Sequence, residues 1–492
     1  MRTNHVNPKL VVILLVLAMF LTGSSIFASQ SYPPVQAIPS FGIITPGQNG
    51  NRLFLPFVLN TPEQFSEPKV NIPYFSASVA MNQTAIFWFG RVTPNDPYVD
   101  VRTGYNPNAL VIHIAVIDRR LWCSTNDPEN LALWDSVELF LDKSTQPSNQ
   151  LNANAYRFTG QLSSPDCPDF TKAFQGGSSG WQAEPISFTA RTGWRGNSPN
   201  DNSDDRGWTM DFQIPFASLG MSSAPKQGEV WKLAVLVHDR NDGAGNAISS
   251  QQWPDDFNTD QPTTWGDIRF GLPSYTPPPA TQEGVVTVRN KLNGISVMDG
   301  QVGGSTVCGE GLDYWTQWGE TSYPGSQDND KVNIQNQDDV ADWPCFSKYY
   351  VTFPLNSIPP GKVILSARLR LHQFGNSGSP TDNPPRSYIQ VFTVGKDWSE
   401  SSLTWNNAPQ MTENVSEAWV DPLPSFPGWP GVLRTWDVSR AVAMAYISGE
   451  PLRLALYSAD EGYHTGKYFV SSDTGDWNAE ARPELQISLG QP

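Results

Sequence analysis

The chain has 492 residues and a formal net charge of −16, with 32 basic and 48 acidic side chains. This acidic balance excludes the basic surface that nucleic-acid phosphates require, disfavours anionic polymers and is compatible with neutral glycans. Only 16% of the residues are charged and 12% are aromatic, while 42 Pro and 39 Gly supply turns, a composition that predicts two all-β domains. Solvation of an extracellular surface explains the charge without a specific partner.

The N-terminus has the layout of a secretory signal peptide over residues 1–28. Arg2 and Lys9 precede an unbroken apolar run over residues 10–21, which is short for a membrane span. Small residues allow cleavage after Ala28 or as late as Ala37. We therefore expect a secreted protein, extracellular or on the cell surface, without a membrane segment after cleavage. An uncleaved membrane anchor is the competing interpretation.

Composition also divides the rest of the chain. Residues 29–68 are rich in Pro, Gly, Ser and Asn and predict a leader of low order. A first domain over residues 69–272 and a second over residues 284–492 follow. The Pro-rich segment 273–283 between them predicts a semi-extended linker that holds two folded units apart.

Strand patterns dominate both domains. Residues 231–238 and 365–371 place apolar side chains at every second position, as half-buried strands do. One helix is predicted, from Asp437 as N-cap to Gly449 as the residue after its C-terminus, and we expect it to cover an edge of the second domain. The predicted fold class is all-β, with two tandem antiparallel, jelly-roll-like β-sandwiches joined by the Pro-rich linker.

The four cysteines fall two in each domain, which agrees with export. Because a linker separates the domains, we expect Cys123 to pair with Cys167 and Cys308 with Cys345. Zinc is the alternative, but the chain has no C-x-x-C motif and only five histidines.

The second domain contains several motifs in an order that is typical of one module. They are residues 363–371 (Val-Ile-Leu-Ser-Ala-Arg-Leu-Arg-Leu), Trp398, residues 404–409 (Thr-Trp-Asn-Asn-Ala-Pro), residues 436–439 (Trp-Asp-Val-Ser) and residues 483–487 (Pro-Glu-Leu-Gln-Ile). From about Gly284 to the C-terminus, the chain resembles the DNRLRE domain, also called the family 96 carbohydrate-binding module. The resemblance implies a β-sandwich on a secreted bacterial protein and points to polysaccharide attachment.

The first domain is similar to a second family, the family 9 carbohydrate-binding modules and their DOMON-like relatives. The segments with this similarity are residues 110–118, 133–142 (with Asp-Ser-Val-Glu), 207–216 (with Gly-Trp and Ile-Pro) and 265–271. In this chain, residues 85–91 replace the I-D-G-x-x-D-x-x-W motif with which that family begins. The ligand-binding residues of the family are therefore not assigned to positions in this chain.

Aromatic side chains are the first candidates for sugar binding, because their rings stack on the apolar faces of pyranoses. We assign Trp231, Trp405 and Trp436 to packing within the two cores. Polar, loop-like stretches contain the candidate ligand-binding residues, which are Trp181, Trp194, Trp253, Tyr314, Trp315, Trp318 and Trp343.

Clusters of Asp, Asn and Gly suggest a structural calcium ion, which takes six to eight oxygen ligands. The clusters are residues 200–205, residues 239–243 with Asn246, and residues 327–330, and none has the spacing of an EF-hand loop. Solvated Asx turns are the alternative explanation. The family 9 resemblance favours one calcium ion in the first domain. The candidate ligands there are Asp201, Asp204, Asp239, Asn241 and Asp242.

Catalytic motifs are weak. Residues 176–180 satisfy G-x-S-x-G but lack the strand-to-helix setting of a nucleophile. Asp135 and Glu138 are the only acids to test as a glycosidase pair. The sequence therefore favours a secreted, non-catalytic polysaccharide-binding protein, with neutral glycans ahead of anionic ones. A cell-envelope or matrix adhesion protein and a glycan-degrading hydrolase are the alternatives.

Overall fold

The computed structural model describes residues 68–492, apart from 245–247, 305–307, 309–310, 323–330, 378–383 and 396. Residues Asn60–Pro492 form one structural unit, to which every described residue belongs. The predicted signal peptide and all but the last residue of the predicted leader lie outside the described residues. Within the described part, no helix has the length and apolar character needed to cross a membrane.

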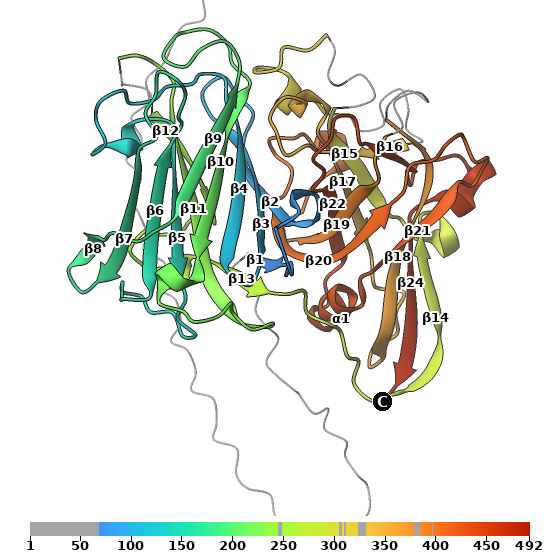
Figure 1. Cartoon of the computed structure of the whole chain (residues 1–492). Helices are drawn as coiled ribbons and strands as arrows, with labels where there is room; N and C mark the ends of the chain where they lie inside the picture. Colours follow the sequence, from blue (N-terminus) through green and yellow to red (C-terminus); the bar gives the residue numbers. More distant parts are fainter. Residues whose placement is uncertain are drawn as a thin grey trace, which may run out of the picture. The chain divides into compact units, whose positions relative to one another are not determined.

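The first domain is a sandwich of two β-sheets (Figure 1). At the centre of one sheet, Ile114 lies opposite Met210 and Val116 opposite Trp208, and all four are buried. Alternate side chains point inward because successive residues of a strand face opposite sides of the sheet. The strands of this sheet, in spatial order, are β2 (Ala85–Gly90), β3 (Tyr98–Tyr105), β4 (Ala109–Ile117), β10 (Gly207–Pro215) and β9 (Thr189–Arg195).

The facing layer of the first sandwich contains the predicted alternating strand. Trp231, Leu233, Val235 and Val237 are buried there, as the sequence pattern predicts. Its strands are β1 (Lys69–Ile72), β13 (Gly266–Phe270), β11 (Val230–Arg240) with β12 (Ile248–Trp253) beside it, β5 (Ser136–Asp142), β6 (Ala155–Gln161), β7 (Thr171–Gly177) and β8 (Gly180–Ala183).

The second domain is likewise built from two layers. One layer contains β14 (Thr281–Arg289), β24 (Glu484–Gln491), β18 (Val363–Asn376) with β21 (Val432–Asp437) beside it, β23 (Lys467–Val470) and β16 (Lys331–Ile334). The other contains β15 (Met298–Gly303), β17 (Ser347–Phe353), β22 (Leu452–Ser458), β19 (Ser387–Val394) and β20 (Met411–Val420). The predicted all-β class of two tandem sandwiches is confirmed.

The predicted helix is present and slightly shorter than expected. Helix α1 spans Ser439–Ser448 and ends at Gly449, whose φ of 73° is a left-handed conformation that favours glycine. Asp437 is the last residue of β21, and its carboxylate accepts a hydrogen bond from the Ser439 amide at 3.0 Å. The helix packs against β18 and β22, which belong to different layers, and so covers one end of the second sandwich.

Backbone and side-chain bonds join the two sandwiches. Strand β1 pairs in parallel with both β13 and β20, so one sheet continues from the first half into the second. Asn71 and Asn414 exchange buried hydrogen bonds, with the Asn71 amide donating to Asn414 Oδ1 at 2.7 Å and Asn414 Nδ2 donating to Asn71 O at 2.9 Å. The halves are therefore in direct contact, whereas the linker was expected to hold them apart.

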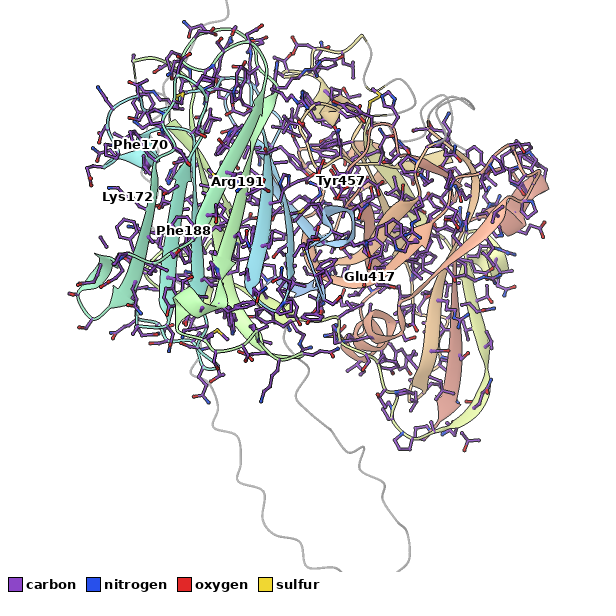
Figure 2. All side chains as sticks on the ribbon, in the orientation of Figure 1. Phe170, Lys172, Phe188, Arg191, Glu417 and Tyr457 are labelled. Atoms are coloured by element: carbon purple, nitrogen blue, oxygen red, sulfur yellow. A yellow bond between two sulfur atoms is a disulfide. The ribbon has the colours of Figure 1, made fainter. Side chains whose placement is uncertain are left out.

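A buried polar cluster lies where β3 meets the second half. Asp100 accepts hydrogen bonds from the Tyr98 hydroxyl at 2.7 Å and from the Tyr457 hydroxyl at 2.8 Å (Tyr457 is labelled in Figure 2). Lys348 is buried beside them, with its ammonium nitrogen 3.6 Å from the centre of the Trp405 ring. Burial lowers the pKa of Lys348 well below its ordinary value, and the charge of Asp100 opposes this shift.

Removing one hydroxyl tests this cluster. In Tyr457→Phe, the buried Asp100 carboxylate loses a donor that lies across the junction, so we expect the free energy of unfolding to fall by about 1.5–3 kcal/mol. Urea unfolding followed by fluorescence measures the change. Tyr463→Phe is the matched control, because Tyr463 is 53% exposed. Equal stabilities of the two variants would contradict a stabilising role for the cluster.

Candidate functional site

Five aromatic side chains of the second sandwich form an exposed group, which we call the aromatic strip. Trp477 is 64% exposed, Phe426 56% and Trp429 45%, while Phe374 and Tyr468 are half-buried. Large apolar side chains are usually buried, and a contiguous exposed group of them marks an interaction surface. None of the five was a candidate from the sequence.

The strip is positioned by strands and two connecting segments. Phe374 is on β18 and Tyr468 on the neighbouring β23. Phe426 and Trp429 lie in the loop before β21, where Gly431 has a φ of 102° and a Cβ would meet the Gln373 carbonyl oxygen at 2.7 Å. Glycine therefore lets the loop lie close against β18.

Trp477 lies in the short 3₁₀ segment η9 (Asp476–Ala481). The buried Arg482 side chain holds this segment, because its Nη2 donates to the Asp476 carboxylate and to the Thr474 carbonyl, both at 2.6 Å. Trp477 is thus presented by an ordered turn while its own ring stays exposed.

The rings of the strip contact one another. Trp429 and Trp477 are 5.3 Å apart between ring centres and inclined by 80°, and Phe426 and Trp429 are 5.1 Å apart and inclined by 71°. Phe374 lies 5.5 Å from Trp429 and 6.3 Å from Tyr468. The two contacts of Trp429 with Phe426 and Trp477 are edge-to-face, and those of Phe374 are tilted; both geometries are favourable for aromatic pairs.

The side of the strip beside β21 contains two uncharged side chains. Leu433 is 39% exposed and lies opposite His372 in the β18–β21 pairing. Burial lowers the pKa of His372, so its imidazole is neutral at pH 7. His372 Nδ1 is 3.3 Å from the Ala481 carbonyl oxygen, which links β18 to the segment of Trp477. Charged groups lie at the edges of the strip, since the Lys331 ammonium is 6.0 Å from the centre of the Tyr468 ring and Asp476 precedes Trp477. The rings themselves form an apolar surface.

Four of the seven aromatic candidates from the sequence are buried. Trp253, Trp315, Trp318 and Trp343 are between 0% and 7% exposed, so their ring faces contact protein. The centres of the Trp315 and Trp318 rings lie 5.2 and 5.1 Å from that of Trp343. Tyr314 is half-buried, with the Arg206 guanidinium 5.1 Å from its ring centre. We leave these residues out of the binding surface.

Trp181 borders a polar group on the outer face of the first sandwich, which we call the sheet-face cluster. In this cluster Glu138 lies 3.7 Å from Arg157 and 3.5 Å from His238 between charged atoms. The Arg157 guanidinium is 3.9 Å from the centre of the Phe174 ring and 5.4 Å from that of Trp181. Charged and aromatic groups thus converge on β5, β6, β7, β8 and β11.

The electrostatics of this cluster disfavour acid catalysis. Burial would raise the pKa of Glu138, but the hydrogen bond to His238 and the charge of Arg157 outweigh it, and the pKa lies below its ordinary value. A glycosidase needs a carboxylic acid that remains protonated near neutral pH. Glu138 is instead a charged hydrogen-bond acceptor. The G-x-S-x-G segment lies in the β7–β8 hairpin, not between a strand and a helix.

Trp194 lines a shallow pocket of about 500 Å³ with Ser163, Thr192 and Asp169. It is half-buried, so part of its ring remains accessible. The pocket is on the same sandwich as Trp181, but the two tryptophans belong to different sheets, because Trp194 is on β9 and Trp181 on β8.

Three carboxylates meet inside the first sandwich. Asp118, Asp135 and Asp239, the carboxylate trio, are buried and have oxygens within 4.8 Å of one another. Asp135 accepts hydrogen bonds from the Trp122 amide at 2.6 Å and the Arg240 amide at 2.8 Å. One oxygen each of Asp118 and Asp239 has no hydrogen-bond donor among the described residues.

Burial and mutual repulsion raise the pKa values of the trio. Burial raises the pKa of Asp239 to about 7, and it raises those of Asp118 and Asp135 well above their ordinary range, with further contributions from the charges of the neighbouring carboxylates. Three adjacent buried carboxylates with unpaired oxygens fit a hard divalent cation such as Ca²⁺, which prefers oxygen ligands.

Of the five metal ligands expected from the sequence, only Asp239 belongs to the trio. Asn241 donates to Asp239 at 2.8 Å. Asp201 accepts a hydrogen bond from the Ser203 amide at 2.6 Å, and Asp204 pairs with Arg119 at 2.8 Å. Asp242 offers its carbonyl oxygen to Arg240 Nε at 2.7 Å. Asp118 was missed because it follows β4 of one sheet, whereas Asp135 precedes β5 and Asp239 is on β11 of the other sheet, so the three residues are close only in the fold.

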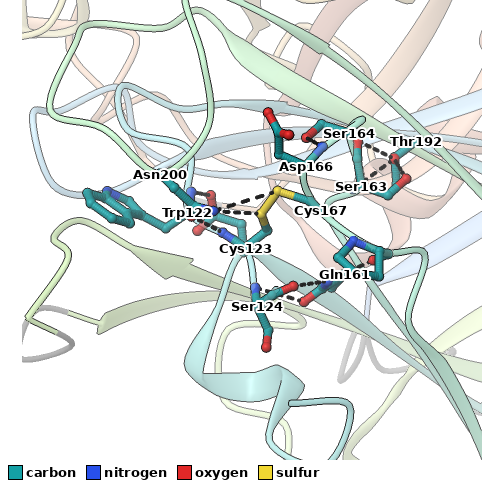
Figure 3. Close-up of a disulfide and its surroundings, with 12 residues drawn as sticks. Trp122, Cys123, Ser124, Gln161, Ser163, Ser164, Asp166, Cys167, Thr192 and Asn200 are labelled. Atoms are coloured by element: carbon teal, nitrogen blue, oxygen red, sulfur yellow. Dashed lines mark hydrogen bonds between the residues drawn. A yellow bond between two sulfur atoms is a disulfide. The ribbon is translucent and has the colours of Figure 1, made fainter. Parts of the chain in front are cut away.

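Both predicted disulfides are confirmed, Cys123–Cys167 and Cys308–Cys345. Figure 3 shows the first of them beside Asn200, whose Oδ1 accepts a hydrogen bond from the Cys123 amide at 2.9 Å. Cys123 directly follows Trp122, the residue that donates to Asp135. The disulfide therefore fixes the segment that supports the carboxylate trio.

Comparison with known proteins finds similarity over parts of the chain. Residues 324–488, a third of the chain, match the model of carbohydrate-binding module family 96, which confirms the resemblance of the second domain. Two solved structures of a family 9 carbohydrate-binding module from Caldicellulosiruptor kristjanssonii are also similar. The complex with cellotriose is 16% identical over 42% of this chain and 95% of that chain, with a TM-score of 0.31. The complex with glucose is 15% identical over 43% and 100%, with a TM-score of 0.30. No curated protein matches this chain.

The exposed and buried tryptophans differ in a testable way. We expect Trp343→Ala to lower the free energy of unfolding by about 3–5 kcal/mol, because it empties a fully buried site. Trp477→Ala removes a largely exposed ring, so its effect is expected to stay within about 0.5 kcal/mol. Chemical unfolding of both variants measures the difference. A large loss in Trp477→Ala would mean that this ring is structural.

Proposed function

We propose that this protein is a secreted, non-catalytic polysaccharide-binding protein whose main binding surface is the aromatic strip. The observation that supports this most directly is the exposure of Phe426, Trp429 and Trp477 within the region that matches family 96. Secretion is supported by the two disulfides, which persist in oxidising compartments, and by the signal-like N-terminus.

The chemistry of the strip fits a neutral glycan. The C–H faces of a pyranose ring stack on indole and phenyl faces, and its hydroxyl groups remain hydrated at the edges. The chain is acidic overall, with a net charge of −16, so long-range electrostatics disfavour a uronate polymer. The ligand proposed for the strip is therefore an uncharged polysaccharide.

The sheet-face cluster is a second surface that supports the proposal. Glu138 offers carboxylate oxygens to sugar hydroxyls, Arg157 offers N–H donors, and Trp181 lies next to both. One face of the Trp181 ring is covered by Trp265, at 6.4 Å between centres and 10° between planes. With one surface on each sandwich, a single glycan chain that reaches both would gain avidity.

The strip is tested by retention on glycans. In the variants Trp429→Ala and Trp477→Ala, we expect affinity for the retained polysaccharide to fall about 30-fold each, because a central aromatic contact is worth about 2 kcal/mol. Pull-down and affinity electrophoresis on cellulose, xylan, mannan, chitin and alginate measure the loss. Tyr463→Ala, an exposed aromatic residue outside the strip, serves as the control.

Three outcomes separate the possible functions. Retention without release of sugar supports a binding protein, and release of reducing sugar would make the protein a hydrolase. If the wild-type protein is retained on no glycan and self-associates on a sizing column, the strip serves a protein partner. The function is then adhesion or assembly in a matrix.

We further propose that the carboxylate trio holds one structural Ca²⁺ ion. The ion would neutralise three buried carboxylates and use the unpaired oxygens of Asp118 and Asp239. Its role would be to stabilise the first sandwich, because the trio joins β11 to the residue before β5 and the residue after β4.

Chelation tests the ion. We expect EDTA to lower the melting temperature and added Ca²⁺ to restore it, since a ligand at a hundred times its Kd stabilises the folded state by about 2.7 kcal/mol. Asp118→Asn should abolish the response to Ca²⁺. Asp204→Asn should retain it, because Asp204 pairs with Arg119 and Arg120 at the surface. A melting temperature that is independent of both EDTA and Ca²⁺ would refute the site.

A further inference from the structure

A cleft of about 960 Å³ lies between the two halves. The first half contributes Arg91, Gln251 and Asp256 to its lining, and the second half contributes Glu320 and Asn407. The aromatic strip contributes no residue to it. The volume lies at the upper end of the roughly 300–1,000 Å³ of small-molecule sites, which is room for a short oligosaccharide.

Direct hydrogen bonds across the junction fix the walls of the cleft. Asn406 accepts from the Val92 amide at 2.8 Å, and its Nδ2 donates to the Val92 carbonyl at 3.0 Å. Within the second half, the same Nδ2 donates to Glu320 at 2.7 Å. Gln410 donates to the Asp255 carboxylate at 2.8 Å. The cleft is therefore held by bonds between the halves, as a preformed site requires.

The charged side chains that line the cleft indicate which ligands it can bind. The cleft is lined by one guanidinium, that of Arg91, and by four carboxylates, those of Asp96, Asp255, Asp256 and Glu320. Charged hydrogen-bond acceptors therefore outnumber charged donors, and anions are repelled. Asp256 is exposed and has no hydrogen-bond partner among the described residues. Such a lining suits a ligand with many hydroxyl donors.

Two observations argue against a cation as the ligand. None of the three groups of clustered metal-binding side chains in the described part of the chain includes a residue of this cleft. In addition, the Arg91 guanidinium lies among the lining carboxylates and offsets part of their charge.

We propose that the cleft between the two sandwiches is a second binding site, specific for a short neutral oligosaccharide. Carboxylate and amide side chains from both halves accept and donate hydrogen bonds to its hydroxyl groups. This site is independent of the aromatic strip and does not depend on the function proposed for it. Because the ligand touches both halves, its binding also stabilises the junction between them.

The experiment uses the mature protein with the strip removed, as the double variant Trp429→Ala/Trp477→Ala. Calorimetry is carried out with cello-, xylo- and manno-tetraose, with chitosan tetramer as the cationic probe and a tetra-uronate as the anionic probe. We expect at least one neutral tetramer to bind. Adding Asp256→Ala or Arg91→Ala should weaken that binding about tenfold, while Asp166→Ala, an exposed acid outside the cleft, should leave it unchanged.

Each remaining outcome overturns the inference. If the strip-free protein binds no neutral tetramer, the cleft is not such a site, and retention of the wild type on polysaccharide would still support the strip. If only the chitosan or uronate probe binds, the ligand class is wrong. Binding that is insensitive to both Asp256→Ala and Arg91→Ala would place the ligand elsewhere. Because both side chains are exposed, their removal is not expected to impair folding.

Discussion

The junction between the two sandwiches depends on polar groups that are buried and satisfied across it. Asp100 receives two tyrosine hydroxyl groups, one from each half, and Lys348 lies against aromatic rings from both. The aromatic rings around them, such as Trp88 of the first half and Phe392 of the second, belong to one buried cluster and would be exposed to water if the halves separated, so each half would expose an unfavourable surface without the other. The cleft and the continuous sheet both follow from this burial. Two modules that resemble separate families therefore behave here as one folded unit.

The fold was largely predictable from the sequence, because it depends on local patterns. Alternating apolar residues in 231–238 identified β11, and Gly449 identified the end of α1. The cysteine pairs followed from their distribution between the domains. The contact between the halves was not predictable, because β3 is buried along its whole length only after the second domain covers its outer side.

Whether a tryptophan ring is buried or exposed could not be predicted from the sequence. A tryptophan in a polar stretch looks the same whether its ring packs inward, as Trp318 does, or stays exposed, as Trp477 does. Phe426 and Trp429 lie in a Pro- and Gly-rich loop, which was a usable signal, since loops that present aromatic residues often have functional roles. The carboxylate trio draws on residues more than a hundred positions apart, and only the fold brings them together.

The pairing of β1 with strands of both halves has a mechanical consequence. A protein anchored to a polymer is under tension when the surrounding fluid moves. A pull on the chain that precedes Lys69 acts along β1, which is hydrogen-bonded in parallel to β13 over four residues and touches β20 at Lys69. The four pairs with β13 lie across the direction of the pull and shear together, while the single pair with β20 and the Asn71–Asn414 bonds pass part of the load to the second sandwich. Strand β1 therefore transmits a pull on the preceding chain to both sandwiches.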